Sequence, residues 1–378
     1  QSALTGVPII ILFVQSNNIS LADFFLLQAF FSVWMLIFEI PSGYISDRWG
    51  RKNTLMIAAV ASVIGTTLYA NGTELMHYFV AEFFFGIFIS FNSGTFEAIT
   101  YDTLLEAKEE GKSRRIITHQ FIVHMVAHAT AAIAGGFIAV TWGLRTAMWV
   151  QVPAMVLGLL VVFMLVEPHR KKLQEERHLK AMYNVCKFSL IESAPLRSII
   201  LLFAVLSSMT LALLWVSQPY QQKIGLPLAL FGAAHAVIII GGAIAAKLAE
   251  MAEKDFDDRK LLIIIASIVI ASYILLGFAN SLYMGMALLF LGRAGWGPLR
   301  PITTDIINKL ASSDIRATVL SVRTFMMRIF YTLFMPILGY MIDAFSLKQA
   351  LLIAGISVGA LVLVMFVSMR KIWGEIPK

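Results

Sequence analysis

Long apolar segments recur from one end of this chain to the other, and they decide what it can fold into. Of its 378 residues, 58% are hydrophobic and 14% are charged, with a mean hydropathy of +0.79. A chain of this length cannot bury so much apolar surface in water, so lipid must be its second solvent. A membrane-spanning helix needs roughly 20 apolar residues, and the segments lack the alternation of transmembrane strands. We therefore predict an all-α membrane protein with spans near residues 1–16, 22–46, 53–71, 75–101, 115–140, 145–166, 197–220, 226–250, 260–279, 281–308, 314–342 and 348–370.

The first of these twelve spans is short. Ala3–Val14 is only twelve residues long before the polar Gln15–Ser20 segment. At about 1.5 Å of rise per residue, such a helix cannot cross the hydrocarbon core. We expect this helix to begin upstream of Gln1.

The basic residues collect in alternate loops. The loops on one side of the predicted membrane hold only Arg145, Lys223 and Lys348, and nearly all others lie on the opposite side. The positive-inside rule then places the central polar segment and the C-terminus in the cytoplasm, with the protein in the cytoplasmic (inner) membrane. The net charge of +7 reflects this topology, so we expect no nucleic-acid partner. The single cysteine, Cys186, has no partner for an internal disulfide.

One cytoplasmic loop carries a recognisable motif. Residues 43–52 read GYISDRWGRK and lie between the second and third predicted spans. The spacing G-x-x-x-D-R-x-G-R-K resembles the signature of the major facilitator superfamily, whose members are secondary transporters that work by alternating access. A tight turn with a solvated basic cluster is the simpler alternative. The matching residues are Gly43, Asp47, Arg48, Gly50, Arg51 and Lys52.

The resemblance implies an architecture and a cytoplasmic gate. Members of this superfamily have two pseudo-symmetric six-helix bundles. Their signature loop meets an acid at the end of the fourth helix and a basic residue on the eleventh, and Asp102 and Arg323 occupy those places here. The resemblance therefore implies a gate made of Gly43, Asp47, Arg48, Arg51, Asp102 and Arg323.

An internal repeat supports two halves. Gly94–Asp102 aligns with Gly297–Asp305 at an offset of 203 residues (297 − 94), and the same offset aligns Gly136 with Gly339. We predict an amino-terminal bundle over residues 1–166, a cytoplasmic linker helix over 167–196 and a carboxy-terminal bundle over 197–378.

Ionisable side chains inside the predicted spans are candidate functional groups, because each costs roughly 2.5–3.5 kcal/mol on insertion scales. Acids and histidines lie in the first half, and arginines lie in the second. The planar guanidinium of arginine can donate paired hydrogen bonds to a carboxylate or phosphate, whereas buried acids and histidines can bind protons. The alternative is that the carboxylates of the first half and the arginines of the second half only form ion pairs with each other. The substrate candidates are Arg293, Arg300, Arg328, Trp296, Trp215, Gln218 and Tyr220, and the proton-coupling candidates are Glu97, Glu82, His124 and His128.

Glu97 is the first choice for coupling. The 203-residue offset of the internal repeat aligns Glu97 with Arg300. In the superfamily the first, fourth, seventh and tenth helices line the cavity, so the resemblance implies that these two residues lie on opposite cavity walls. His124 and His128 are spaced i, i+4, which can bind a metal, but packing against a neighbouring helix is the preferred interpretation. We therefore assign no metal ligand.

Two local patterns bear on the direction of transport. The sequence FEIPSG at residues 38–43 resembles a segment that bacterial efflux members carry before the signature loop. In the fifth span, however, Ala127, Ala131 and Ala132 replace the first glycines and the proline of the drug–proton antiporter pattern. In the fourth span, Glu82 stands where these antiporters carry an arginine. The first pattern favours export, whereas the second is compatible with uptake.

The leading hypothesis is therefore proton-coupled transport of a small organic solute with an anionic group, by a monomer in the lipid bilayer. The alternatives are a carrier of a metal ion or siderophore-like chelate, and a non-transporting membrane receptor. Because no nucleotide-binding loop, nucleophile elbow or metalloprotease motif is present, we predict neither an enzyme nor a cofactor.

Overall fold

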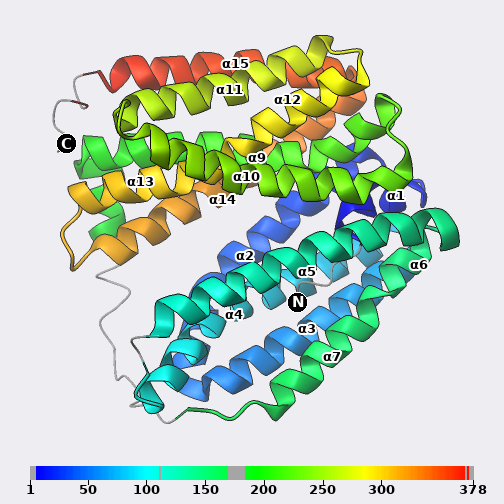
Figure 1. Ribbon diagram of the computed structural model, residues 1–378, viewed down its shortest axis with the longest axis vertical. Coiled ribbons are helices and arrows are strands. Elements are labelled where there is room, and N and C mark those ends of the chain that lie inside the picture. Colours follow the sequence, from blue (N-terminus) through cyan, green and yellow to red (C-terminus); the bar gives the residue numbers. More distant parts are fainter. Residues whose placement is uncertain (1–5, 110–111, 169–183, 371–372, 374–378) are drawn as a thin grey trace. The chain divides into compact units, whose positions relative to one another are not determined.

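A computed structural model describes residues 6–109, 112–168, 184–370 and 373 (Figure 1). Within these residues the secondary structure is helical, with no strand. Ten of the described helices are long and apolar enough to cross a membrane. This confirms an all-helical membrane protein, whereas the full set of twelve spans remains a prediction.

The chain divides into two compact units, Gln1–Gln174 with Pro227–Ala236, and Glu175–Leu226 with Val237–Lys378. The second unit therefore begins within the predicted linker, but the first unit also includes the first part of the eighth predicted span. The three-part division predicted from the sequence remains a prediction.

The first unit is built mainly from long helices. Its elements are η1 (Val7–Ile9), α1 (Ile10–Gln15), α2 (Leu21–Trp49), α3 (Arg51–Asn71), α4 (Leu75–Glu106), α5 (Ser113–Trp142), α6 (Leu144–Trp149), α7 (Gln151–Met164) and η4 (Leu228–Leu230). The expected first span appears as η1 and α1, and the expected sixth span is divided into α6 and α7 at Val150.

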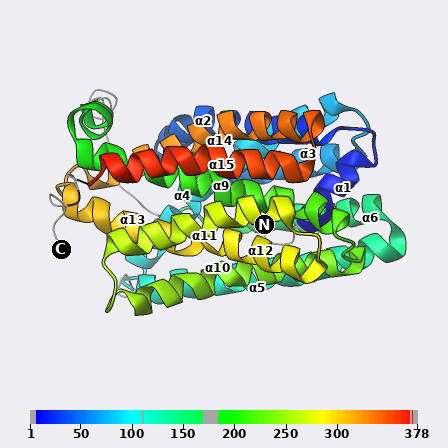
Figure 2. The ribbon, with the colours of Figure 1, turned by 90° about the horizontal axis from the view of Figure 1, so that it is seen from above.

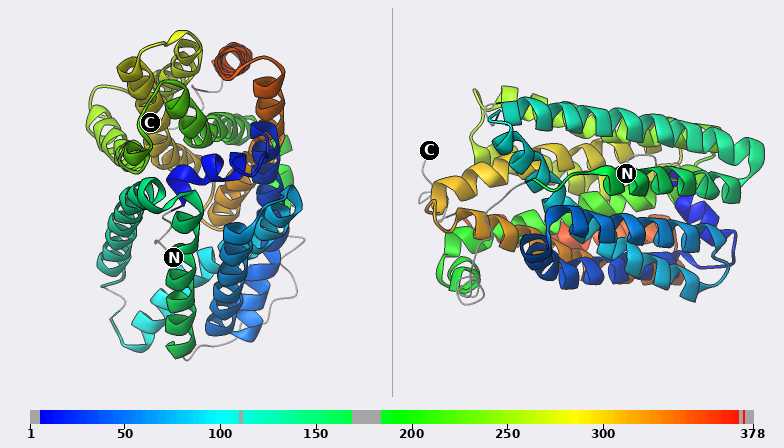
Figure 3. Two further views of the ribbon diagram at one scale, coloured as in Figure 1. Left: turned by 90° about the vertical axis from the view of Figure 1, so that its right-hand side faces the viewer. Right: turned by 90° about the horizontal axis from the view of Figure 1, so that it is seen from below.

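Local sequence explains where the longest of these helices begin and end. Ser20 and Asp23 form a capping box that starts α2, with the Asp23 amide 3.0 Å from Ser20 Oγ. The helix continues through Pro41 to Trp49, and Gly50, with φ 111°, turns the chain directly into α3. Helices α2, α3 and α4 pack as one group (Figures 1 and 3), with Ala58, Ala61, Phe88 and Phe91 buried between them.

The second unit contains a π-helical turn, η3 (Phe188–Glu192), followed by long helices. These are α9 (Ala194–Lys223), most of α10 (Phe231–Ala252), α11 (Asp258–Phe278), α12 (Leu282–Ala294), α13 (Trp296–Leu310), α14 (Arg316–Ala344) and α15 (Leu347–Ser368). The expected tenth span is thus divided into α12 and α13 at Gly295.

Close helix contacts define the core of this unit. Helix α11 lies beside α12 and α15 (Figure 2). The buried Tyr273 hydroxyl donates a hydrogen bond to the Met209 carbonyl oxygen at 2.8 Å, which ties α11 to α9. Helices α10 and α13 approach so closely that a Cβ on Gly297 would lie 1.8 Å from the Gly242 carbonyl oxygen. Glycine is therefore required at the start of α13, next to the division at Gly295.

Candidate functional site

The signature loop is held by an acid that lies far away in the sequence. The Glu167 carboxylate accepts hydrogen bonds from the backbone amides of Arg51 at 2.8 Å and Lys52 at 2.6 Å. These amides are the unsatisfied donors at the start of α3, where the helix dipole also favours a negative charge. A Cβ on Gly50 would lie 3.1 Å from Glu167 Oε1, so the glycine leaves room for this cap.

Sequence reasoning missed Glu167 because its partners are backbone groups, which no side-chain pattern reveals. The only available signal is its position directly after the sixth predicted span, in the sequence LVEP. There its carboxylate lies on the same predicted side of the membrane as the signature loop.

We predict that Glu167→Gln destabilises the first unit. Glutamine keeps one acceptor oxygen but loses the charge and the second acceptor, so roughly 1–3 kcal/mol of stabilisation is expected to be lost. The apparent melting temperature of the purified protein should fall by about 2–6 °C. The matched control is Glu192→Gln, because Glu192 is half exposed and pairs with Lys187 at 3.0 Å. Equal melting temperatures for the two variants would contradict a capping role.

The structure brings three of the predicted gate residues together. The Arg51 Nε atom is 2.6 Å from Asp102 Oδ2, and its Nη1 atom is 3.6 Å from Asp47 Oδ1. Arg51 and Asp102 are largely buried, whereas about half of the Asp47 side chain is exposed. Arg48 does not join this cluster, because its Nη1 atom donates to the Tyr44 hydroxyl at 2.6 Å on an exposed surface.

A small polar cavity adjoins this cluster between α2 and α4. It has a volume of about 280 Å³, and hydroxyl groups and two carboxylates line it. Gly43 forms part of its wall, with no atom near the position of a Cβ. The lining residues are Glu39, Ser42, Gly43, Ser46, Asp47, Arg51, Ser90, Ser93, Gly94 and Thr95.

The two candidate coupling acids differ in their surroundings. Glu82, on α4, is 4% exposed, and the buried Gln28 amide on α2 donates to its Oε1 at 3.2 Å. No ion pair of Glu82 occurs among the described residues. Glu97 lies further along α4 and is exposed. Burial of an unpaired charge is costly, so Glu82 is suited to carry a proton.

The predicted histidine pair has a third member. His128 Nε2 lies 3.3 Å from Nε2 of the buried His235, which lies near the start of α10, in the part of that helix that belongs to the first unit. The centre of the His124 ring lies 6.2 Å from that of the His128 ring. One Nε2 must carry the proton and the other must accept it, so His128 and His235 are not both fully protonated. Within the described residues, no group of three or more His, Cys, Asp or Glu could hold a metal ion.

His235 was missed because the contact depends on a stripe of small residues. A Cβ on Gly232 would lie 2.0 Å from the Ala132 carbonyl oxygen, and Gly136 approaches the Gly232 amide. Small side chains allow helices in membranes to approach this closely. The alanines that replace the antiporter pattern in the fifth span therefore preserve close packing.

In the second unit, Arg293 occupies the last turn of α12, directly before the division at Gly295. It is 8% exposed, and its guanidinium carbon lies 4.7 Å from the centre of the Trp296 ring. No hydrogen-bond partner for its Nε atom occurs among the described residues. The stacking supports the guanidinium as a cation–π pair and leaves a buried donor available to a ligand.

Arg323 on α14 is also buried and its Nε atom likewise has no hydrogen-bond partner among the described residues, but its Nη1 atom has three. Its Nη1 atom donates to Thr304 Oγ1 at 2.8 Å, to Thr303 Oγ1 at 3.0 Å and to the Arg300 carbonyl oxygen at 3.3 Å. The Phe203 ring covers it at 4.4 Å. The Arg300 side chain is exposed on α13, and Arg328 is partly buried. Glu97 belongs to the first unit and Arg300 to the second.

Two of the three substrate candidates on α9, Tyr220 and Gln218, are buried. Tyr220 is completely buried, and its hydroxyl donates to the carbonyl oxygens of Leu276 at 2.8 Å and Ala279 at 3.2 Å. It thereby satisfies groups at the end of α11. Gln218 is 2% exposed, whereas Trp215 is partly buried.

Comparisons with known proteins give the family. The profile of the Major Facilitator Superfamily matches residues 2–332. No curated protein sequence matches the chain. Among solved structures, a mutant form of the nucleoside transporter NupG is similar, with a TM-score of 0.81 and 12% identity over 98% of this chain and 95% of that one.

Two further solved structures have the same fold. A bacterial homologue of the human lysosomal transporter Spinster, inward-facing and unoccupied, gives a TM-score of 0.77 at 14% identity, covering 100% of this chain and 96% of that one. A POT family transporter in complex with 5-aminolevulinic acid gives 0.72 at 14% identity, covering 100% and 93%. With the profile match over most of its length, this chain belongs to the Major Facilitator Superfamily and is a polytopic membrane transporter.

Proposed function

We propose that this transporter moves a small organic molecule with a carboxylate or phosphate group and couples that movement to protons. The observation that carries the proposal is Arg293, a buried guanidinium stacked on Trp296 whose Nε has no partner in the described part of the chain. A buried guanidinium is stabilised by an anion that accepts hydrogen bonds from its N–H groups. A substrate anion meets that requirement.

Arg293 and Arg323 have different roles in this proposal. Three neutral oxygens already accept from Arg323, so it acts in holding α13 and α14 together at the gate. Arg293 makes the substrate contact, and Trp296 keeps the guanidinium in place. Arg300, with its exposed side chain, is a second candidate for anion contact. One similar structure contains 5-aminolevulinic acid, but at 14% identity that likeness concerns the fold alone.

Proton coupling is assigned to Glu82, with Glu97 as the competing candidate. Glu82 is buried and accepts a hydrogen bond from a neutral amide, so it can be held in either protonation state. Alternating access then requires that the two conformations stabilise these states differently. The cluster of Asp47, Arg51 and Asp102 forms the cytoplasmic gate, because its charge-assisted contacts can be made in one conformation and released in the other.

The direction of transport is proposed to be export, because of the FEIPSG sequence before the signature loop. The observed histidine contact gives little support to the alternative of a metal carrier, since His128 and His235 pair with each other. A metal-chelate substrate with its own carboxylates would still suit Arg293. A non-transporting receptor would not require a buried acid and a buried arginine in its two units.

A ligand screen tests this proposal. Purified protein is heated with organic anions, matched neutral esters, cationic drugs, siderophores and divalent metals at pH 5.5 and pH 7.5. A ligand at 100 times its Kd stabilises the native state by about 2.7 kcal/mol. We expect one or more organic anions to raise the melting temperature while their esters do not. Stabilisation by cationic drugs or free metals, with none by anions, would overturn the proposal.

A further inference from the structure

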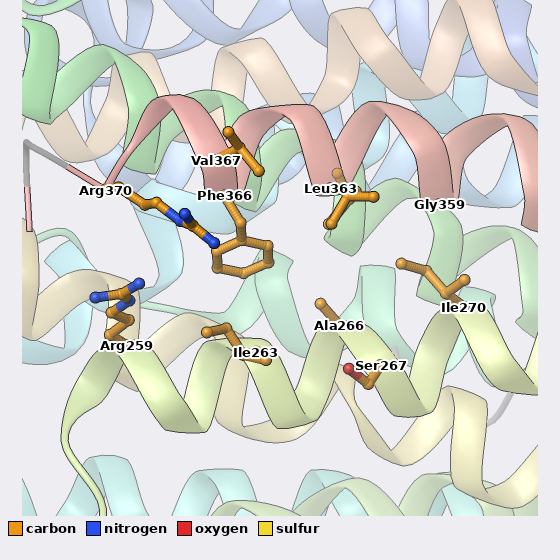
Figure 4. A pocket seen from close by; sticks show the side chains of 11 residues that line it. Arg259, Ile263, Ala266, Ser267, Ile270, Gly359, Leu363, Phe366, Val367 and Arg370 are labelled. Atoms are coloured by element: carbon orange, nitrogen blue, oxygen red, sulfur yellow. The ribbon is translucent and has the colours of Figure 1, made fainter.

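A groove on the second unit lies between α11 and α15, apart from the residues assigned to transport. Its volume is about 360 Å³, and its walls are almost entirely apolar (Figure 4). The helices come together at one end, where a Cβ on Gly359 would lie 2.9 Å from Ile270. At the other end lie Arg259, on α11, and Arg370, just beyond the end of α15, both on the same side of Phe366 (Figure 4).

The length of the groove matches one leaflet of a bilayer. Ile270 follows Arg259 by eleven positions along α11, and Arg370, two residues beyond the end of α15, follows Gly359 by eleven positions. At 1.5 Å per residue this is about 16 Å, close to half of a hydrocarbon core of about 30 Å. Both helices are long and apolar enough to span the membrane, and Leu363 and Val367 on the groove wall are exposed. The walls therefore face lipid chains.

The two arginines lack an anionic partner within the described residues. Neither guanidinium takes part in an ion pair there. The nearest acids in the sequence are already engaged, because Asp257 accepts from the Lys260 amide at 2.9 Å and Asp258 pairs with Lys309 at 3.3 Å. Two facing cations at the mouth of an apolar groove repel each other, and an anion between them would relieve this.

We propose that this groove binds one anionic phospholipid of the cytoplasmic leaflet. The phosphate lies between Arg259 and Arg370, and one acyl chain lies along the apolar walls towards Ile270 and Gly359. The charge distribution of the loops puts both arginines on the cytoplasmic side, where basic residues attract anionic headgroups. A zwitterionic lipid binds more weakly, because its ammonium group approaches two guanidiniums.

Lipid titration with native mass spectrometry tests the proposal, using phosphatidylglycerol, phosphatidylcholine and inorganic phosphate as probes. The wild-type protein should retain phosphatidylglycerol in preference to phosphatidylcholine. The double variant Arg259→Gln/Arg370→Gln should bind phosphatidylglycerol about 30-fold more weakly, at about 1 kcal/mol for each basic residue. The matched control is Arg197→Gln/Lys254→Gln, which removes two basic residues at the same predicted side of the second unit, outside the groove.

A second pair of variants tests the apolar part of the site. Ser267→Phe fills the groove from an exposed position, whereas Ile268→Phe adds the same ring at an exposed position outside it. Only Ser267→Phe should reduce phosphatidylglycerol binding. Equal losses in groove and control variants, or no loss in either groove variant, would overturn the proposal. Binding of inorganic phosphate as tight as that of phosphatidylglycerol would also overturn it, since the groove would then hold an ion alone.

Discussion

Replacing Arg293 by alanine is expected to weaken binding of the anionic ligand by roughly 30- to 4,000-fold. Truncating one partner of a buried, hydrogen-bonded charge pair costs about 2–5 kcal/mol, and each 1.4 kcal/mol is tenfold in Kd. Arg293→Lys should bind with intermediate affinity, because it keeps the charge but loses the planar fork and its stacking on Trp296. The measurement is isothermal titration with the organic anion that gives the largest shift in the thermal screen.

The control for this prediction is a second buried arginine of the same unit. Arg323→Lys alters a guanidinium whose partners are threonine hydroxyls and a backbone carbonyl, so the Kd for the anion should stay near the wild-type value. The methyl ester of the ligand gives an independent test. It should bind wild type and Arg293→Ala equally weakly, because the charge that Arg293 recognises is missing. Unchanged affinity of Arg293→Ala for the free acid would remove Arg293 from the site.

The residues of the signature loop were predictable because the motif fixes a short local structure. One residue, Gly50, connects α2 to α3, so Asp47 and Arg51 are necessarily neighbours. Asp102 at the end of α4 was placed by family resemblance, and its contact with Arg51 at 2.6 Å agrees with that placement. The apolar runs likewise predicted most of the spans, because a membrane-crossing helix leaves a strong compositional signal.

Other features depend on contacts that leave no pattern in the sequence. The division of the tenth predicted span at Gly295 lies next to the close packing of Gly297 on Gly242, in another helix. His235 reaches His128 only because Gly232 packs on Ala132. Glu82 and Glu97 lie on one helix and are equivalent in the sequence, as acids in an apolar segment. Only the structure shows that Glu82 is buried and Glu97 is exposed.

That difference in burial leads to the second large effect, on coupling. In liposomes with a pH gradient of one unit, the wild-type protein should concentrate its substrate about tenfold for each proton coupled, since one unit is worth 1.36 kcal/mol. Glu82→Gln should reduce this accumulation to about onefold, because the amide cannot bind or release a proton. Exchange of labelled for unlabelled substrate should survive, since glutamine resembles the protonated acid and can still pair with Gln28.

Glu97→Gln is the matched variant, with the same chemical change on the same helix at an exposed position. We expect it to keep most of the pH-driven accumulation, because an exposed side chain loses little when its charge is removed. Loss of accumulation in Glu97→Gln together with retention in Glu82→Gln would reverse the assignment and make Glu97 the coupling group. Retention in both variants would instead remove the α4 acids from the mechanism and direct attention to the pair of His128 and His235, whose contact requires one of them to stay neutral.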